Sequence, residues 1–276
     1  TSDYVGMTNL VNSSGVVAAD VSAVGTAREG LSALNYGGDK AIFAYGQTGS
    51  SKVSMSNLVS NSGVVASDVT GVGTARTFSA GAGYGLDKGI FAYGLTGSNV
   101  SMSNLVSNSG VVATDTTGVG TARRLNNGGT GYGTDKAIFA YGYVSGPVSM
   151  SNLVSSSGVV ASDVTGVGTA RLYLAAAEYG GDKAIYGYGD NGSSKVSMTN
   201  LVNNSGVIAS DVTGVGTARS YLSATRYGGD KAIFAYGMTP SNVNTKNLVN
   251  NSGVVAADAS SAGTARRNGD AAAYGY

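Results

Sequence analysis

Charged side chains recur at fixed places along the chain, and they are the first candidates for chemistry. Arginines return at nearly equal intervals, at Arg28, Arg76, Arg123, Arg171, Arg219 and Arg266. Aspartates follow the same period, at Asp20, Asp68, Asp115, Asp163, Asp211 and Asp258. Such pairs can line a channel with charge, or form a latch in which each arginine is hydrogen-bonded by carboxylates or carbonyls. The latch is favoured, because a scaffold needs a joint in every unit.

The nearest aspartate in the sequence is the expected partner of each arginine. Arg76 is therefore paired with Asp68, and Arg123 with Asp115. A second repeated pair places Asp next to Lys, as at Asp87 and Lys88. Tyrosines in the repeated Tyr-Gly positions could offer a sugar platform, but their presence in every unit favours packing between units.

Composition excludes most familiar active sites. The chain has no cysteine and no histidine, and therefore no thiol nucleophile, imidazole base or usual zinc ligand. We expect no metal and no cofactor. The 17 basic and 16 acidic side chains nearly cancel, so no basic field is expected to hold nucleic acid. A carboxylate-dependent hydrolase, with Asp190 and a channel aspartate as the pair, is disfavoured because nearly all acidic residues are copies of the repeat.

The residue pattern of each unit predicts about four short strands. Residues 53–56 alternate Val and Met with Ser, the pattern of a strand with one buried face. A turn signal at 61–63 leads into the apolar run 64–66, which makes a hairpin. A second hairpin turns at 85–88 into 90–93, which is apolar on both faces. Four strands in a unit of this period, with almost no helical signal, are typical of a propeller blade.

We therefore predict an all-β, single-domain, six-bladed β-propeller with about four antiparallel strands per blade. The five full units are expected at 25–70, 73–117, 120–165, 168–213 and 216–259. The closing blade takes its third and fourth strands from 1–22 and its first strand from 263–276. The alternative fold is a β-solenoid, although the hairpin turns favour antiparallel neighbours and solenoid coils are parallel.

The closing blade is expected to be incomplete. Six complete units would exceed the chain by about 12 residues, which corresponds to one strand and its loop. The blade is therefore one strand short, or the chain is a fragment of a larger propeller. A partner chain that completes the blade, or a homo-oligomer, is compatible with this gap. No apolar run long enough for a membrane span and no leader is visible, and residue 1 is Thr, as in a processed or partial product.

The order of elements resembles the kelch repeat. An arginine opens the unit, and a strand, a turn, an Ile-Phe-x-Tyr-Gly strand such as 42–46, a variable loop and a hairpin follow. The wording Gly-Thr-Ala-Arg, Tyr-Gly-Gly-Asp-Lys-Ala-Ile-Phe-Ala-Tyr-Gly and Asn-Leu-Val-Ser-Asn-Ser-Gly-Val-Val-Ala-Ser-Asp is similar to kelch-like repeat proteins of tailed phages of marine bacteria. This resemblance implies a kelch-like propeller, a virion or tail component, and a virion or extracellular location.

The units differ in two places, the segment after each arginine and the loop after Tyr-Gly. Those loops are 47–52, 95–99, 143–147, 190–195 and 238–242. In an up-and-down blade both places emerge on one face, opposite the constant turns. Loops on a rigid scaffold often carry recognition, so binding is assigned to this variable face, with neutral drift as the alternative. The candidate binding residues are Phe78, Arg124, Asn126, Asn127, Tyr143, Tyr173, Tyr221 and Arg226.

These features together predict a non-enzymatic structural or adhesion module. The preferred hypothesis is a phage virion-associated propeller whose variable face binds other virion proteins or a host-surface receptor or glycan. Aromatic, amide and arginine side chains suit a protein patch or a glycan. The second hypothesis is a free glycan-binding lectin. No partnership with nucleic acid and no membrane insertion are expected.

Overall fold

The fold is all-β, as predicted from the sequence. The computed structural model describes residues 4–275, which form strands, turns and irregular segments with no helix. This range accordingly offers no helix that could cross a membrane. The predicted terminal segments 1–22 and 263–276 begin and end in residues 1–3 and 276, which lie outside the described residues.

Five antiparallel sheets repeat one order of strands, in which a central strand lies between two neighbours. The first two sheets are β1 (Ser32–Tyr36), β2 (Lys40–Ala44) and β5 (Ser56–Val59), then β6 (Ala80–Tyr84), β7 (Lys88–Leu95) and β8 (Asn99–Val106). The next two are β9 (Gly129–Tyr132), β10 (Lys136–Ala140) and β11 (Ser151–Val154), then β12 (Ala175–Tyr179), β13 (Lys183–Gly187) and β14 (Thr199–Val202). The fifth is β15 (Ser223–Tyr227), β16 (Lys231–Ala235), β17 (Thr245–Val249) and β18 (Ala259–Ser260), and the two-stranded hairpin is β3 (Gln47–Thr48) with β4 (Ser51–Lys52).

The central strand is buried on both faces in the second to fifth sheets, whereas in the first sheet Phe43 of β2 is half-buried. In β10, Ala137, Ile138, Phe139 and Ala140 have no exposed surface. The apolar run without polar alternation therefore marks a strand that is covered on both sides, as the sequence indicated.

The fourth strand of each unit is reduced to isolated bridges in most sheets. In the first sheet, Val59 pairs with Val65 and Ser56 pairs with Val69, but no ladder forms between them. The side chain of Asn57 occupies this space, since its amide donates to the carbonyl oxygen of Ala66. A side-chain hydrogen bond thus replaces the backbone pairing that a regular fourth strand would make.

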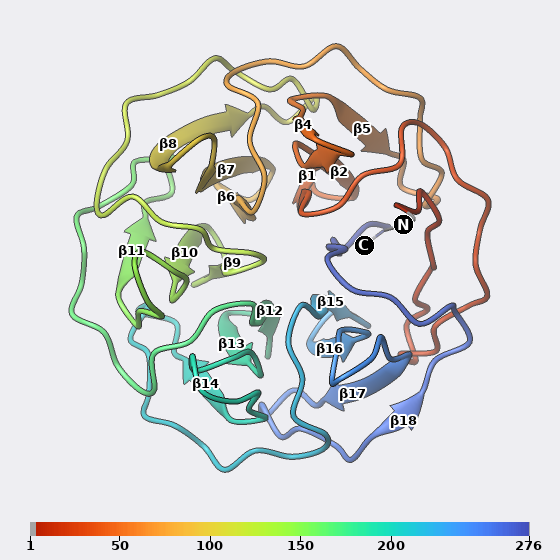
Figure 1. The fold of residues 1–276 in the computed structure, drawn as a ribbon, viewed down its shortest axis with the longest axis vertical. Helices are drawn as coiled ribbons and strands as arrows, with labels where there is room; N and C mark the ends of the chain where they lie inside the picture. The colour runs from red at the N-terminus through yellow and green to blue at the C-terminus, as the bar shows by residue number, and fades with distance from the viewer. Residues whose placement is uncertain (1–3, 276) are drawn as a thin grey trace.

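The five sheets lie in chain order around a common centre, with the first strands β1, β6, β9, β12 and β15 innermost (Figure 1). Neighbouring first strands contact one another, as β1 contacts β6 and β9 contacts β12. The two ends of the chain meet in the sector between the fifth sheet and the first (Figure 1). We call this arrangement the ring, and the meeting place of the two ends the seam.

One contact between units occurs six times and includes both terminal segments. A tyrosine ring at the end of an inner strand packs against a glycine in the outer turn of the following unit. The pairs are Tyr36 with Gly110, Tyr84 with Gly158, Tyr132 with Gly206, Tyr179 with Gly253, Tyr227 with Gly15 and Tyr274 with Gly63. Because Gly15 and Tyr274 belong to the terminal segments, the contact runs around the whole ring.

Replacing Gly158 with Ala tests this contact. A Cβ there would lie 2.7 Å from the ring of Tyr84, on a backbone with φ of +82°. Gly181→Ala is the matched control, because Gly181 also has φ of +82° but no atom within 4 Å of a Cβ. We expect the control to lose about 1 kcal/mol of unfolding free energy from backbone strain, and Gly158→Ala to lose clearly more. Equal losses in urea unfolding would contradict a packing role for the contact.

Candidate functional site

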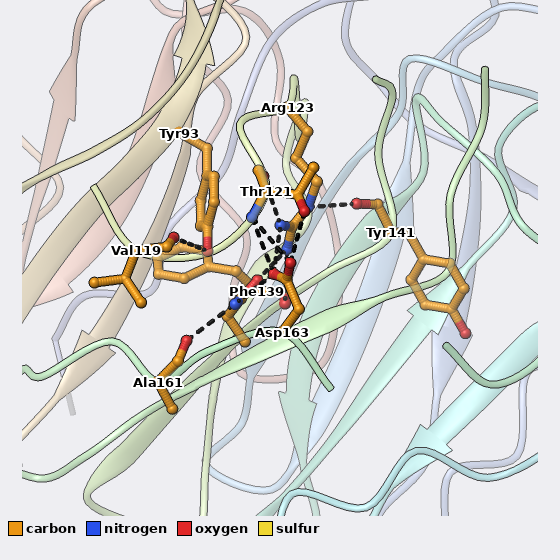
Figure 2. Close-up of polar contacts among 9 residues, drawn as sticks. Tyr93, Val119, Thr121, Arg123, Phe139, Tyr141, Ala161 and Asp163 are labelled. Atoms are coloured by element: carbon orange, nitrogen blue, oxygen red, sulfur yellow. Dashed lines mark hydrogen bonds and ion pairs between the residues drawn. The ribbon is translucent and has the colours of Figure 1, made fainter. Parts of the chain in front are cut away.

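The repeated arginines lie between neighbouring units, and Arg123 shows the arrangement (Figure 2). Its guanidinium carbon lies 4.3 Å from the ring centroid of Tyr93, which belongs to the preceding sheet. Its Nη2 donates to Oδ1 of Asn152 at 2.6 Å, in the sheet that follows. Its Nε and Nη1 donate to the carbonyl oxygens of Tyr141 and Thr121. The side chain is fully buried and has partners for its cationic N–H groups.

Asn152 connects the buried arginine to a carboxylate nearer to solvent. Its amide donates to Oδ1 of Asp163 at 2.9 Å, and Asp163 in turn accepts the backbone N–H and hydroxyl of Thr121. Arg123 and Asp163 are 3.8 Å apart, and the aspartate side chain keeps 32% of its surface exposed. We call this tyrosine, arginine, asparagine, aspartate and threonine set the joint.

The parts of the joint recur around the ring, although in the fifth unit Nη2 of Arg219 and Oδ1 of Asn247 are not bonded to each other. The arginines that stack on a tyrosine of the preceding unit do so at 3.9 to 4.5 Å, and they are Arg76 on Tyr45, Arg123 on Tyr93, Arg171 on Tyr141, Arg219 on Tyr188 and Arg266 on Tyr236. The asparagines that bond to the aspartates are Asn9 with Asp20, Asn57 with Asp68, Asn104 with Asp115, Asn152 with Asp163, Asn200 with Asp211 and Asn247 with Asp258.

The pairing of charges differs from the sequence prediction. Arg76 lies 3.9 Å from Asp115, not beside Asp68, and Arg123 pairs with Asp163, not with Asp115. Each aspartate comes from the outer segment of the arginine's own unit, which folds back only after the last strand of the sheet. The nearest aspartate in the sequence is the wrong partner, because it belongs to the outer segment of the preceding unit and pairs with the arginine of that unit.

The asparagines are the members of the joint that the sequence prediction missed. They stand in the repeated Asn-Leu-Val segment, 28 or 29 residues after the arginine that they contact in the second and third units. That constant spacing was the available signal. Asn104 and Asn152 are fully buried, so a polar side chain there requires a bonded partner.

Burial and hydrogen bonding shift the titration of the joint in opposite directions. The pKa of Arg123 lies below its usual value, because burial lowers it more than the nearby Tyr93 and Asp163 raise it. Burial raises the pKa of Tyr93 to about 12. Burial also acts to raise the pKa of Asp163, but the hydrogen bonds from Thr121 and Asn152 outweigh it, and the pKa lies below its usual value. The carboxylate is therefore held in its charged form at neutral pH.

The same joint closes the seam. Arg266 stacks on Tyr236 at 3.9 Å, donates to Oδ1 of Asn9 and lies 3.5 Å from Asp20. The N–H of Thr264 also donates to Asp20. Residues near the two ends of the chain thus make the bonds that neighbouring sheets make elsewhere.

The two variable regions lie side by side in every full unit. The residue after the arginine pairs with the first residue of the loop, as Thr77 does with Leu95 and Leu172 does with Asp190. The loops themselves turn back as hairpins, for example between Tyr143 and Pro147. The structure therefore gathers the variable residues in one region of each unit.

A belt of backbone hydrogen bonds links the segments after the arginines. The N–H of Phe78 donates to the carbonyl of Gly30, that of Gly30 to Asn268, that of Asn268 to Tyr221, and that of Tyr221 to Tyr173. All five residues have φ between +56° and +59°. Glycine adopts this left-handed backbone readily and asparagine tolerates it, but aromatic residues adopt it at a cost. The belt therefore imposes strain on Phe78, Tyr173 and Tyr221.

Five of the eight predicted binding residues are aromatic or lie against an aromatic ring. Four of them form two pairs, and the fifth, Phe78, stands alone. The rings of Tyr173 and Tyr221 are stacked, with centroids 3.9 Å apart. Arg124 lies over the ring of Tyr143 at 4.4 Å. Phe78 is half-buried in the belt.

Arg267 extends the tyrosine pair and was missed from the sequence. Its guanidinium carbon lies 6.0 Å from the centroid of Tyr221. The signal was the doubled arginine at Arg266 and Arg267, which the third unit shares at Arg123 and Arg124.

The other three predicted binding residues lie elsewhere. Asn126 and Asn127 are buried, at 6% and 7% exposure, rather than presented on a surface. Asn127 donates to the carbonyl oxygens of Leu222 and Gly269, which ties the third unit to the fifth and to the C-terminal segment. Arg226 lies in β15 and pairs with Glu178 of β12 at 3.1 Å. The third unit has one extra residue after its arginine, and these asparagines absorb it.

Two acidic residues outside the repeated set accept backbone N–H groups. Within residues 4–275, no cluster of three His, Cys, Asp or Glu residues could hold a metal ion. Asp190, the candidate of the hydrolase hypothesis, accepts the N–H of Gly192 at 2.8 Å in a turn. Asp270 lies among the inner strands, where it accepts the N–H groups of Ala33 and Ala271.

Replacing Arg171 with Leu tests whether the joint stabilises the ring. The change leaves Oδ1 of Asn200 and the carbonyl of Thr169 without their donor and removes the stack on Tyr141. We expect a loss of about 2–4 kcal/mol. Arg267→Leu is the control, because Arg267 is exposed, and it should change stability by less than about 0.5 kcal/mol. Similar unfolding midpoints for Arg171→Leu and the wild type would exclude a latch.

Asp270 should make stability depend on pH. Burial raises its pKa to about 7 in the folded chain, against 3.8 for the unconstrained group, although the two N–H donors lower it. The unfolded chain therefore releases this proton first, and stability should fall as pH rises from about 4 to about 7. The chain has no histidine that would titrate in this window. Urea midpoints of Asp270→Asn should lack this fall; an unchanged slope would contradict the assignment.

No protein-family model matches the chain, and no curated protein matches it either. Function is therefore inferred from the molecule's own geometry. The joints are built from residues that recur in every unit. The stacked tyrosines and the neighbouring arginines do not recur, and they are the best candidates for a site that recognises a partner.

Proposed function

We propose that the chain is a six-bladed, kelch-like β-propeller that serves as a non-enzymatic structural or adhesion module of a phage virion. The five sheets would be five blades, and the two ends of the chain would form the sixth. The repeated strand order, the inner position of the first strands and the six tyrosine–glycine contacts support this proposal. The antiparallel pairing within each sheet argues against the β-solenoid, whose coils stack in parallel.

The strained aromatic residues of the belt carry the proposed binding function. Gly30 occupies the belt without strain, whereas a left-handed backbone costs about 1–2 kcal/mol at residues such as Tyr173 and Tyr221. Strain of this kind concentrates at functional sites, where the surrounding structure maintains it. A drifting loop would be expected to return to glycine or asparagine at these positions.

The side chains indicate the chemistry of the partner. Tyr173, Tyr221 and Arg267 form one group, and Arg124 with Tyr143 forms another. Tyrosine and arginine dominate the energetic centres of protein interfaces. The partner is therefore a protein surface, either another virion protein or a receptor on the host, and one that offers apolar or acidic groups.

A free glycan-binding lectin is the second candidate, because tyrosine rings can also pack against sugar faces. In that case a glycan array should show saturable binding that is lost in the Tyr173→Ala, Tyr221→Ala double variant. The particle-bound protein is expected to give no such glycan-specific signal if its partner is a protein.

Purified particles test the preferred function. Mass spectrometry should find the chain on the particles, and its presence only in uninfected cell extract would contradict the proposal. If the partner is a receptor on the host, particles with Tyr173→Ala and Tyr221→Ala should carry as much of the chain as wild type but adsorb to host cells at least about tenfold more slowly, the effect of about 1.4 kcal/mol. If the partner is another virion protein, these particles should carry less of the chain than wild type. Val64→Ala is the control, since Val64 is 65% exposed in a constant outer segment. Equal amounts of the chain and equal adsorption in all three would remove the recognition role.

A further inference from the structure

The seam contains both edges of a sheet but no strand between them among the described residues. Residues 270–274 take the place of an inner strand: Tyr274 packs on Gly63, and Gly275 donates to the carbonyl of Asp39 at 2.7 Å. Tyr36 of β1 and Gly37, which follows it, make the same two contacts with the second unit. The C-terminal segment therefore sits where β1 sits in the first sheet.

Residues 8–11 take the place of a third strand. Thr8 pairs with Val21 and Val11 pairs with Val17, as Ser56 and Val59 of β5 pair with their outer segment. In the first sheet β2 fills the space between β1 and β5, with Ile42 opposite Leu34 on one side and Leu58 on the other. At the seam this space is a cavity of about 510 Å³, lined by 4–11 on one side and 264–274 on the other. We call it the strand slot.

The strand slot leaves apolar side chains exposed that are covered in the other units. Phe43 lines it and is half-buried, whereas its counterparts Phe91, Phe139 and Phe234 have no exposed surface. Those three rings pack against a tyrosine of the preceding unit, as Phe91 does against Tyr45 with centroids 5.4 Å apart. Phe43 has no such ring against it among the described residues, because no central strand of a preceding unit carries a tyrosine to it.

Arg28 points to the same requirement. The other five repeated arginines stack on a tyrosine of the preceding unit. Arg28 bonds to Asn57 at 2.6 Å and pairs with Asp68, but no described tyrosine lies under its guanidinium. A tyrosine near the end of an inserted strand would supply the ring to Arg28 and to Phe43 together.

Backbone groups at both ends of the strand slot define the length of a strand that fits it. In the other units the N–H of a glycine donates to the backbone carbonyl of an aspartate in the next unit, as Gly180 does to Asp230. The N–H of Gly228 has no such acceptor among the described residues. At the opposite end, Gly46 donates to the carbonyl of Arg76. The equivalent carbonyl of Arg28 receives no such bond within residues 4–275.

The other units show what kind of segment meets these requirements. It has eight residues: its first residue, an Asp, accepts the glycine N–H with its backbone carbonyl, and it ends with Tyr-Gly, which reaches the arginine. It reads Asp-Lys-Ala-Ile-Phe-Ala-Tyr-Gly at 39–46, 135–142 and 230–237. The chain has five segments of this type, and each is already paired in its own sheet. None of them is free to fill the strand slot.

We infer that the strand slot binds one extended peptide strand from outside residues 1–276, with small and large apolar residues in the order Ala-Ile-Phe-Ala followed by Tyr-Gly. The strand would pair with backbone on both sides, with residues 270–274 on one and residues 8–11 on the other. Pairing along both edges provides more hydrogen bonds than addition to a single open edge. This inference is independent of the variable face, so a failure here leaves the proposed function untouched.

A synthetic peptide tests the inference on the intact chain. The chain has no tryptophan, so Phe43→Trp places a single reporter in the wall of the strand slot. Adding Asp-Lys-Ala-Ile-Phe-Ala-Tyr-Gly should shift its emission to shorter wavelength, saturate at one peptide per chain and raise the unfolding temperature. A peptide with Pro in place of Ile should bind at least tenfold more weakly, because it loses a ladder hydrogen bond and the apolar side chain. Val111→Trp, at an exposed position of the second unit outside the lining of the strand slot, should show no shift.

Calorimetric titration of the wild-type chain with the same two peptides keeps the test valid if Phe43→Trp folds poorly. Saturable binding of the Ile peptide at one to one, with weaker binding of the Pro peptide, supports the inference. Absence of binding, or equal binding of both peptides, overturns it. A dimer that buries the tryptophan reporter and ignores the peptide would also overturn it, because the strand slot would then be filled by a second copy.

Discussion

The ring depends on a buried guanidinium held between an aromatic ring and an asparagine. A sheet of three short strands is at the lower limit of independent stability, so each unit relies on its neighbours. The joint supplies this support without burying a complete ion pair. Arg123 is fully buried, but Asp163 remains about one third exposed and is reached through Asn152. The carboxylate therefore keeps much of its hydration. The side-chain amide of Asn152 links it to the buried guanidinium through two hydrogen bonds.

The constant joint allows variation nearby. The third unit has one extra residue after Arg123, and the chain absorbs it with two left-handed residues, Asn126 and Asn127. Neither β9 nor the joint is displaced, because Arg123 and Tyr93 fix the entry to the unit. The aromatic residues of the belt are tolerated for the same reason: the hydrogen bonds on both sides of Tyr221 hold its backbone in place.

Period and local pattern predicted the first two strands of each unit better than the other two: the strand predicted at 53–56 begins only at Ser56, and the run 64–66 forms an isolated bridge at Val65. They also predicted the partners of the charged residues poorly. The apolar run at 90–93 and the turn at 85–88 identify β7 and the turn before it, since burial on both faces leaves a clear mark in the sequence. The partner of Arg76 was wrong because the aspartate that contacts it returns only after the whole unit has folded. The left-handed backbone of Phe78 could not be predicted either, because it is imposed by the neighbouring units and not by residue type.

The seam has a kinetic and entropic consequence. The bond between Arg266 and Asn9 joins residues 257 apart, whereas the equivalent bond of Arg123 to Asn152 spans 29. In the unfolded chain, closing the longer loop costs about 2 kcal/mol more in chain entropy. Once the five sheets have formed, the seam remains the place where no central strand joins the two edges among the described residues. Sub-global opening should begin there, while the five sheets keep their structure. An incoming strand would thus enter by a hinge-like parting of the ends and would not require the ring to unfold.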